Sequence, residues 1–219
     1  MSRLPPKPPS SVATLAAAVV ALVIGAVLAL VKLAFIPMVE VTRLPALADR
    51  EPGTVYYLRG SSGGGQQWRA KQAAAKQGFV GDIVWTEGEL NQWAQATIRP
   101  TEPSREADAP TPLFLPGTVN FRFLPTGEVQ LATFVTVPVL GSARFIYTAT
   151  GVLEDKTFVP TGGALGHAPI GAIPVVDQLV FDFVSGAFAE AEEVAALAAV
   201  WERAEAVEVT PDGLRLSLR

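Results

Sequence analysis

The sequence of 219 residues has no cysteine and a single histidine, His167. Without cysteine the chain cannot form a disulfide framework, a zinc–thiolate site or a cysteine nucleophile. With one histidine it cannot build the two-histidine motifs of common metal sites. We therefore expect neither a bound metal nor a cofactor.

Charged residues are also scarce, at 17% of the chain against about 25% in typical soluble domains. The shortage is local, because residues 1–40 contain only three basic side chains and one acidic one. The remaining 14 basic and 20 acidic residues give 41–219 a net charge of −6. An acidic surface disfavours contact with a phosphate backbone, so we do not expect nucleic acid as a partner.

One long apolar run stands near the start of the chain. Residues 12–31 are twenty in a row without a charge, and a helix of that length spans about 30 Å, the hydrocarbon thickness of a bilayer. A cleaved signal peptide would have a shorter apolar core and then small residues, whereas this run leads into Lys32, Leu33 and Phe35. The sequence predicts a transmembrane anchor helix over 12–36, ending at Pro37.

The flanking charges predict the orientation of this anchor. Arg3 and Lys7 precede the helix without any acidic residue, and a Lys/Arg excess favours the cytoplasmic side. We expect a single-pass protein of the inner (cytoplasmic) membrane. Its N-terminus would be cytoplasmic and its C-terminal domain extracytoplasmic, facing the periplasm or the cell exterior, so the lipid bilayer is the first expected partner.

The chain divides by composition into four parts. A proline-rich tail at 1–11 and the anchor at 12–36 precede a juxtamembrane connector at 37–65, with a strand expected near 54–58. Residues 66–219 then form one extracytoplasmic domain. Its segment 99–112 is rich in proline and charge and has no aromatic residue, which predicts a mobile loop.

Within this domain the apolar spacing predicts an α+β fold. Helix formers at 66–77 end before Gly78. Apolar residues then alternate along 119–123, 129–137 and 145–153, which predicts a three-strand antiparallel meander with one apolar face. A glycine-rich loop at 161–173, two amphipathic helices separated near Gly186, and a hairpin over 206–218 are expected to follow. The predicted fold is a curved antiparallel sheet packed on amphipathic helices.

The acidic pair Glu87 and Glu89 admits two interpretations. Neighbouring carboxylates can perform acid–base chemistry. However, Thr86 and Glu89 have the spacing of a capping box, and Trp85 and Leu90 occupy the positions of a hydrophobic staple. A helix start explains both the spacing and the apolar flanks, so we interpret the pair as structural.

No catalytic constellation is complete in the sequence. A triad on His167 would need a nucleophile, and Val184-Ser185-Gly186 lacks the first glycine of a nucleophile elbow. The glycines at 162–166 lack the GK[ST] ending of a phosphate-binding loop. Asp177/Asp182 and Glu192/Glu193 fall on polar helix faces. We expect a non-enzymatic protein with no catalytic residue and retain a hydrolase built on His167 only as a third hypothesis.

The apolar sheet face itself leaves two interpretations open. It is either a packed core or the lining of a groove for an acyl chain or another apolar ligand. In the second case the lining would come from the sheet and from the helix after Pro174. The candidate ligand-binding residues are Phe121, Phe123, Val135, Phe145, Tyr147, Leu179 and Phe183.

Two short motifs carry a resemblance to a known family. Residues 85–93 (WTEGELNQW) and 165–174 (LGHAPIGAIP) resemble the "T/S-E-x-E-L-N" helix start and the loop before a helix in the YpmS-like family of single-pass bacterial envelope proteins of unknown function. The order of anchor, helix, strands, loop and terminal elements is also similar. Gly88 and the long segment 99–112 depart from the pattern.

The resemblance implies an extracytoplasmic module, because such proteins have been likened to tubular lipid-binding folds. It implies no catalytic residue. Our first functional hypothesis is therefore an envelope protein that binds a lipid or another apolar ligand. The alternative, from a different class, is a scaffold or accessory subunit that binds an envelope protein partner and has no ligand site.

Overall fold

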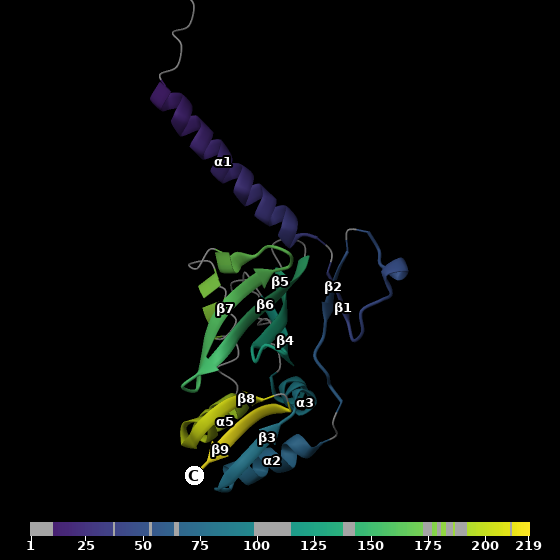
Figure 1. The fold of residues 1–219 in the computed structure, drawn as a ribbon, viewed down its shortest axis with the longest axis vertical. Coiled ribbons are helices and arrows are strands. Elements are labelled where there is room, and N and C mark those ends of the chain that lie inside the picture. The colour runs from purple at the N-terminus through teal and green to yellow at the C-terminus, as the bar shows by residue number, and fades with distance from the viewer. Residues whose placement is uncertain are drawn as a thin grey trace, which may run out of the picture.

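The computed structural model of this chain combines helices with antiparallel sheets, as expected of an α+β protein (Figure 1). It describes residues 11–36, 38–52, 54–63, 66–98, 115–137, 143–172, 177–178, 181–182, 186, 192–210 and 212–219. The predicted proline-rich tail up to residue 10, the predicted mobile loop 99–112, and the candidate residues Leu179 and Phe183 lie outside this range.

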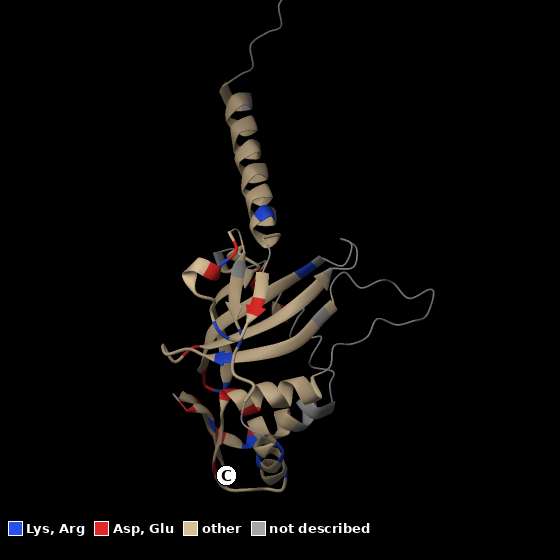
Figure 2. Cartoon of the chain, turned by 90° about the vertical axis from the view of Figure 1, so that its right-hand side faces the viewer, with Lys and Arg blue, Asp and Glu red and all other residues tan. Residues whose placement is uncertain are grey.

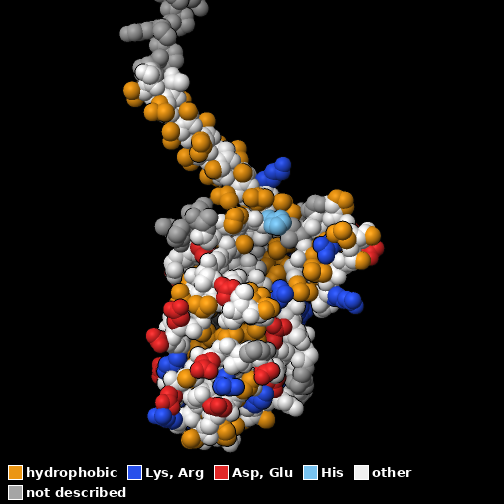
Figure 3. Space-filling model, viewed as in Figure 1, with side chains coloured by type: hydrophobic (Ala, Val, Ile, Leu, Met, Phe, Trp, Pro, Cys, Tyr) orange, Lys and Arg blue, Asp and Glu red, His pale blue; other side chains and the backbone are white. Residues whose placement is uncertain are grey.

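The first element is the apolar helix α1 (Ser11–Ala34). Residues 14–34 are long and apolar enough to cross a membrane, and none of this stretch is buried inside the protein. Figure 3 shows hydrophobic side chains along the length of the helix. Its one basic residue in the last turn is Lys32, whereas acidic and basic residues are interspersed over the domain below (Figure 2). The predicted membrane-spanning length is thus present, and the orientation stays a prediction.

The connector after α1 is folded. Strands β1 (Met38–Val41) and β2 (Val55–Leu58) pair in parallel, and a short 3₁₀ helix (Leu47–Asp49) lies between them. The strand expected near 54–58 is therefore confirmed as β2. Tyr57 of β2 is buried with Ala132 and Ile146 of the main sheet. The connector consequently packs on the domain instead of only leading to it.

The main sheet has four antiparallel strands in chain order: β4 (Leu115–Phe123), β5 (Val129–Val137), β6 (Ala143–Glu154) and β7 (Thr157–Leu165). The first three are the predicted meander. The prediction of a loop from residue 161 was wrong, because β7 extends to Leu165. Pro160 and two glycines conceal the alternation of this strand, and an edge strand tolerates proline. The pairing of β6 with β7 shifts register between Thr150 and Gly151, and this shift accommodates Pro160.

A second antiparallel sheet contains β3 (Gly81–Trp85), β9 (Gly213–Leu218) and β8 (Ala204–Thr210), in that order. The C-terminal hairpin was predicted, whereas β3 was not, so the expectation of one sheet within residues 66–219 is corrected to two. Helices α2 (Gln67–Lys76), α3 (Glu87–Thr97) and α5 (Glu192–Arg203) lie with this sheet, at the end of the molecule away from α1 (Figure 1).

The helix expected after Pro174 is seen in part. Asp177, Gln178, Phe181 and Asp182 are helical, and so is Gly186. The predicted separation of two helices near Gly186 stays a prediction, because residues 183–185 and 187–191 lie outside the described range. Phe181 is half-buried and stacks on Phe158 of β7, with 5.7 Å between ring centroids. This contact places the segment against the same face of the main sheet that carries the larger apolar core.

Candidate functional site

A cavity of about 640 Å³ lies between the two sheets. We call it the inter-sheet cavity. Its volume falls within the roughly 300–1,000 Å³ typical of small-molecule sites. It is therefore the strongest candidate for a functional site in the described part of the chain.

One side of the inter-sheet cavity is formed by the main sheet. Phe121 and Phe123 of β4 lie opposite Leu131 and Val129 of β5. Directly opposed residues of an antiparallel pair project to the same face of the sheet. Leu153 of β6 and Phe158 of β7 add a further opposed pair, and all six side chains line the cavity.

The other side comes from the second sheet and its helices. Leu214, Leu216 and Leu218 alternate along β9, and the first two pair with Trp85 and Ile83 of β3. The helices complete the lining with Ala75, Leu90, Trp93, Leu197, Ala198, Val200 and Trp201. All of these described lining residues are apolar or aromatic.

Lys156 is the one charged side chain among the described residues that line the inter-sheet cavity. It belongs to the two-residue turn between β6 and β7, where Asp155 and Lys156 both have positive φ. Its Nζ donates to the carbonyl oxygens of Glu202 (3.3 Å) and Ala204 (3.0 Å), at the end of α5. The Nε1 of Trp201 donates to the backbone oxygen of Lys156 at 2.9 Å. These bonds join the turn to α5.

The start of α3 shows what the acidic pair does. The Oγ1 of Thr86 accepts from the amide of Glu89, and the Oε2 of Glu89 accepts from the amide of Thr86, so the predicted capping box is confirmed. Glu89 is 2% exposed and forms an ion pair with Lys71, with 2.6 Å between Nζ and Oε2. Burial alone would raise the pKa of Glu89, but hydrogen bonds from Lys71 and Thr86 hold that pKa below its ordinary value.

Glu87 and Asn91 attach α3 to the main sheet. The Oε2 of Glu87 accepts from the amide of Phe123 at 2.8 Å, and its Oε1 accepts from the amide of Ser61. Asn91, which is fully buried, donates to the oxygens of Ser61 and Phe121 and accepts from the amide of Phe121. These bonds fix α3 beside β4 and so position Leu90 and Trp93 in the inter-sheet cavity.

The structure brings two of the predicted ligand residues into the inter-sheet cavity. They are Phe121 and Phe123. Val135, Phe145 and Tyr147 share their sheet face but are not among the residues that line the cavity. The ring of Phe145 instead contacts Phe35 edge-on, with 5.1 Å between centroids.

Tyr147 is buried beneath the helical segment that follows the glycine-rich stretch. Its hydroxyl donates to Oδ1 of Asp177 at 3.5 Å. Burial, and then the nearby Asp177 carboxylate, raise the pKa of Tyr147. Asp177, one of the carboxylates considered in the sequence, thus has a packing partner in the sheet.

The lining residues of the second sheet and of the helices were not predicted as site residues from the sequence. The signals were present as alternation over 214–218 and as helical spacing at Leu90/Trp93 and Leu197/Trp201. Nothing in these local patterns indicates that the two sheets face each other, because that arrangement depends on long-range packing.

The glycine-rich stretch around His167 fixes the end of α1. The amide of His167 donates to the oxygen of Leu33 at 3.3 Å, and the amide of Gly166 donates to that of Ile146 at 2.7 Å. Gly166 has φ +58°, and a Cβ there would lie 2.8 Å from the oxygen of Ala34. These residues allow α1 to meet the domain closely.

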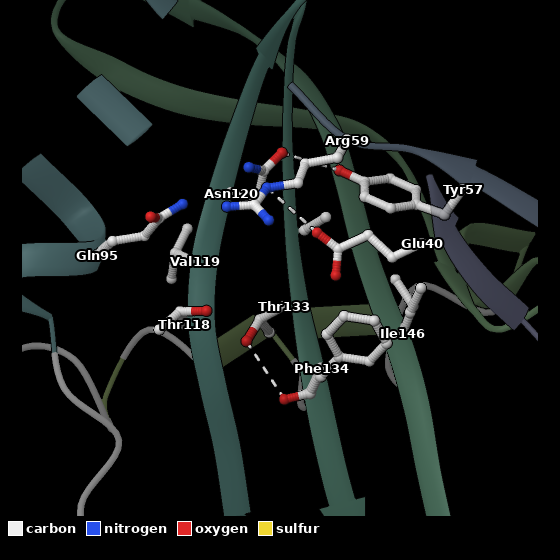
Figure 4. A pocket seen from close by; sticks show the side chains of 11 residues that line it. Glu40, Tyr57, Arg59, Gln95, Thr118, Val119, Asn120, Thr133, Phe134 and Ile146 are labelled. Atoms are coloured by element: carbon white, nitrogen blue, oxygen red, sulfur yellow. Dashed lines mark hydrogen bonds and ion pairs between the residues drawn. The ribbon is translucent and has the colours of Figure 1, made fainter. Parts of the chain in front are cut away.

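A second, smaller pocket of about 70 Å³ lies on the opposite side of the main sheet, beside β2 (Figure 4). The Oδ1 of Asn120 accepts from the hydroxyl of Tyr57 (3.4 Å) and the amide of Gly60 (2.8 Å). The Nε of Arg59 lies 3.3 Å from Oε1 of Glu40. Burial and Glu40 raise the pKa of Tyr57 to about 12. These mutually paired groups hold the connector on the sheet.

In comparisons with protein-family models, with curated proteins and with solved structures, nothing matches this chain. The resemblance to the YpmS-like family therefore stays a prediction from two short motifs.

Proposed function

We propose that this protein is a membrane-anchored, extracytoplasmic binding module that takes up an apolar ligand, an acyl lipid, in the inter-sheet cavity. It would act as a binding protein and not as an enzyme. The observation that carries the proposal is the cavity itself, which has about 640 Å³ of volume and a lining with a single charged side chain among its described residues.

The composition of the lining favours an apolar occupant over water. An ordered water in a cavity needs two to four polar partners, and the described lining side chains offer few polar atoms besides Lys156 and the indole nitrogens. Each methylene group moved from water into such a site contributes about 0.8 kcal/mol. A long acyl chain therefore gains several kcal/mol from occupying the cavity.

The docked end of α1 supports a role next to a membrane. Leu30, Leu33 and Ala34 pack against the larger core, and Phe35 contacts Phe145. The chain thus passes from the candidate membrane helix into the domain without a free linker. A lipid-binding domain attached in this way would stay close to its source of ligand.

The proposal is tested with one variant that obstructs the inter-sheet cavity and one neighbour that does not. Ala198 lines the cavity, whereas Ala199, the next residue of α5, is also exposed and does not line it. The full chain is purified gently in detergent, and native mass spectrometry records bound lipid. We expect lipid on the wild type and on Ala199→Phe, and its loss from Ala198→Phe.

A folded wild-type chain without lipid would contradict the proposal. If that lipid-free chain also bound one envelope protein at fixed stoichiometry, with Ala198→Phe binding equally well, the scaffold alternative would be supported instead. Circular dichroism of all three chains verifies that each is folded.

A further inference from the structure

The connector that follows α1 exposes a group of apolar side chains. Outside α1, seven large hydrophobic residues of the described chain are exposed, and four of them are Phe35, Val39, Leu44 and Leu47. Leu47 is 82% exposed, more than any large hydrophobic residue of α1, where the highest value is 75%. Figure 3 shows hydrophobic side chains at the end of α1 and over the connector beside it. Single exposed hydrophobic residues need no explanation, whereas a group of them marks a contact surface.

The pairing of the two connector strands brings this surface to the end of the domain that carries α1. β1 and β2 are parallel, and parallel strands need a crossover that returns the chain to its starting level. We call residues 42–54 the connector crossover. It ends beside Met38, because Met38 pairs with Val55, and Met38 is four positions after Ala34, the last residue of α1. Figures 1 and 2 accordingly show the short 3₁₀ helix of the connector crossover at this end of the domain.

The connector crossover is fixed in position relative to α1. The amide of Glu51 donates to the hydroxyl of Tyr56 at 2.9 Å, which ties the crossover to β2. The next residue, Tyr57, points to the opposite side of the strand and is buried on the main sheet. Phe35 joins the end of α1 to the same sheet through Phe145. The membrane helix and the connector crossover are thus attached to one rigid element, the main sheet.

The charges of the connector crossover indicate which kind of surface it can meet. Its basic residues Arg43 and Arg50 are balanced by Asp49 and Glu51, and all four are exposed. A net charge of zero gives no general attraction to anionic headgroups or to a charged protein surface. Apolar side chains among charged ones are typical of segments that lie in a bilayer interface, with the apolar groups at the acyl boundary and the charges among the headgroups.

We infer that Leu44 and Leu47 insert into the surface of the same bilayer that α1 crosses, so that the connector crossover forms a second membrane contact. This inference rests on the part of the proposed function that places α1 in a membrane. The recognised partner is the acyl boundary of the lipid and not a particular headgroup. Two attachment points, α1 and the connector crossover, fix the tilt of the domain and hold the inter-sheet cavity in one orientation relative to the bilayer.

The experiment uses the full chain in nanodiscs of phosphatidylcholine alone, because the balanced charges predict a contact that needs no anionic lipid. The chain has no cysteine, so one environment-sensitive dye is attached at Ala46→Cys, an exposed position between the two leucines. Quenching by a phosphatidylcholine with a nitroxide near the top of its acyl chain measures contact with lipid. Quenching by iodide measures contact with water.

We expect the dye at position 46 to be quenched by the lipid nitroxide, shielded from iodide and shifted to shorter emission wavelength. Combining Leu44→Ser with Leu47→Ser should abolish the nitroxide quenching and restore quenching by iodide. The matched control is Val80→Ser, which should change neither, because Val80 is 67% exposed but lies between α2 and β3. All three side chains are exposed, so their replacement leaves the core intact, and circular dichroism verifies the fold.

A dye at Leu28→Cys, an exposed position of α1, distinguishes failure of the second contact from failure of the anchor. Nitroxide quenching at position 28 without quenching at position 46 would overturn the inference and leave α1 in the membrane. The inference would also be overturned if position 46 were shielded from iodide but not quenched by lipid, since a protein partner or a second copy would then cover it. No lipid quenching at either position would overturn the membrane anchoring of the proposed function together with this inference.

Discussion

Glu87 and Glu89 are two positions apart in the sequence, yet they perform different structural tasks. Glu89 caps its own helix and pairs with Lys71. Glu87 instead accepts hydrogen bonds from the amides of Ser61 and Phe123. Each carboxylate is thus engaged with named partners. The pattern that resembles a catalytic pair is explained, residue by residue, as the attachment of α3.

Replacing Glu89 should make stability depend less on pH. Because the folded-state pKa is lowered, the carboxylate contributes stability above its unfolded pKa of about 4.3, and this contribution is lost as the pH falls through the folded value. We expect Glu89→Gln to destabilise the chain by about 2 kcal/mol near neutral pH and by less in acid. Denaturant unfolding followed by tryptophan fluorescence measures both.

The matched control for Glu89→Gln is Glu205→Gln. Glu205 pairs with Arg219, but the two side chains are 49% and 77% exposed. Exposed pairs contribute about 0–1 kcal/mol, so this variant should unfold like the wild type. A Glu89→Gln penalty that does not shrink in acid would show that the carboxylate charge is not what stabilises α3.

Gly88 is required by contact and not by backbone conformation. A Cβ at this position would lie 1.7 Å from the oxygen of Gly63, so the loop before α2 packs directly on α3. Alanine favours a helix by about 1 kcal/mol over glycine, yet we expect Gly88→Ala to destabilise by about 1–3 kcal/mol through this collision. Gly162→Ala, which has nothing within 4 Å, is the control, and thermal unfolding distinguishes the two.

Among the helices and strands, the sequence predicted those that local patterns determine. The anchor helix, α2, the capped start of α3, the strands β4 to β6 and the C-terminal hairpin all have strong periodicity or capping residues. β7 was missed because Pro160, Gly162 and Gly163 interrupt the alternation of apolar residues. β3 was missed because its five residues form a strand only by pairing with β9.

The candidate site could be predicted only on one side. Alternation along β4 identified Phe121 and Phe123, but it could not tell which part of the apolar face is covered. Val135 and Phe145 face the same way and meet other elements, including Phe35 after α1. The residues on the other side of the cavity, including Trp85, Trp93 and Leu216, belong to β3, α3 and β9. These elements are distant in sequence from β4, and no local spacing links them to Phe121 and Phe123.

The contact between the end of α1 and the turn after β7 should depend on Gly166. Gly166 has φ +58°, and a Cβ there would lie 2.8 Å from the oxygen of Ala34. Gly166→Ala therefore combines backbone strain with a steric collision. Gly78→Ala shares the positive φ, at +87°, but has nothing within 4 Å. Both variants should lose about 1–2 kcal/mol to backbone strain, while only Gly166→Ala should speed amide hydrogen exchange at residues 33–36. Equal exchange in the two variants would mean that the contact does not hold α1.

One face of the main sheet contributes to two different regions of the protein. Near α1 it meets Phe35 through Phe145, and at the far end it lines the inter-sheet cavity with Phe121 and Phe123 (Figure 1). If α1 crosses the bilayer, the inter-sheet cavity lies at the end of the domain that is away from the membrane. The ligand would then be held clear of the bilayer, which suits a module that presents or passes on a lipid.

This arrangement requires that the domain and the N-terminal tail lie on opposite sides of the membrane. The chain has no cysteine, so a single introduced thiol reports its own location without background. Asp212 is exposed in the turn before β9, and Ser2 precedes α1. In spheroplasts of a bacterial host, a membrane-impermeant maleimide should label Asp212→Cys directly and Ser2→Cys only after permeabilisation, because Arg3 and Lys7 favour the cytoplasmic side. The opposite pattern would place the inter-sheet cavity in the cytoplasm. Labelling of both thiols before permeabilisation would show that α1 does not separate them, and the proposed address of the domain would have to be given up even if its cavity binds lipid.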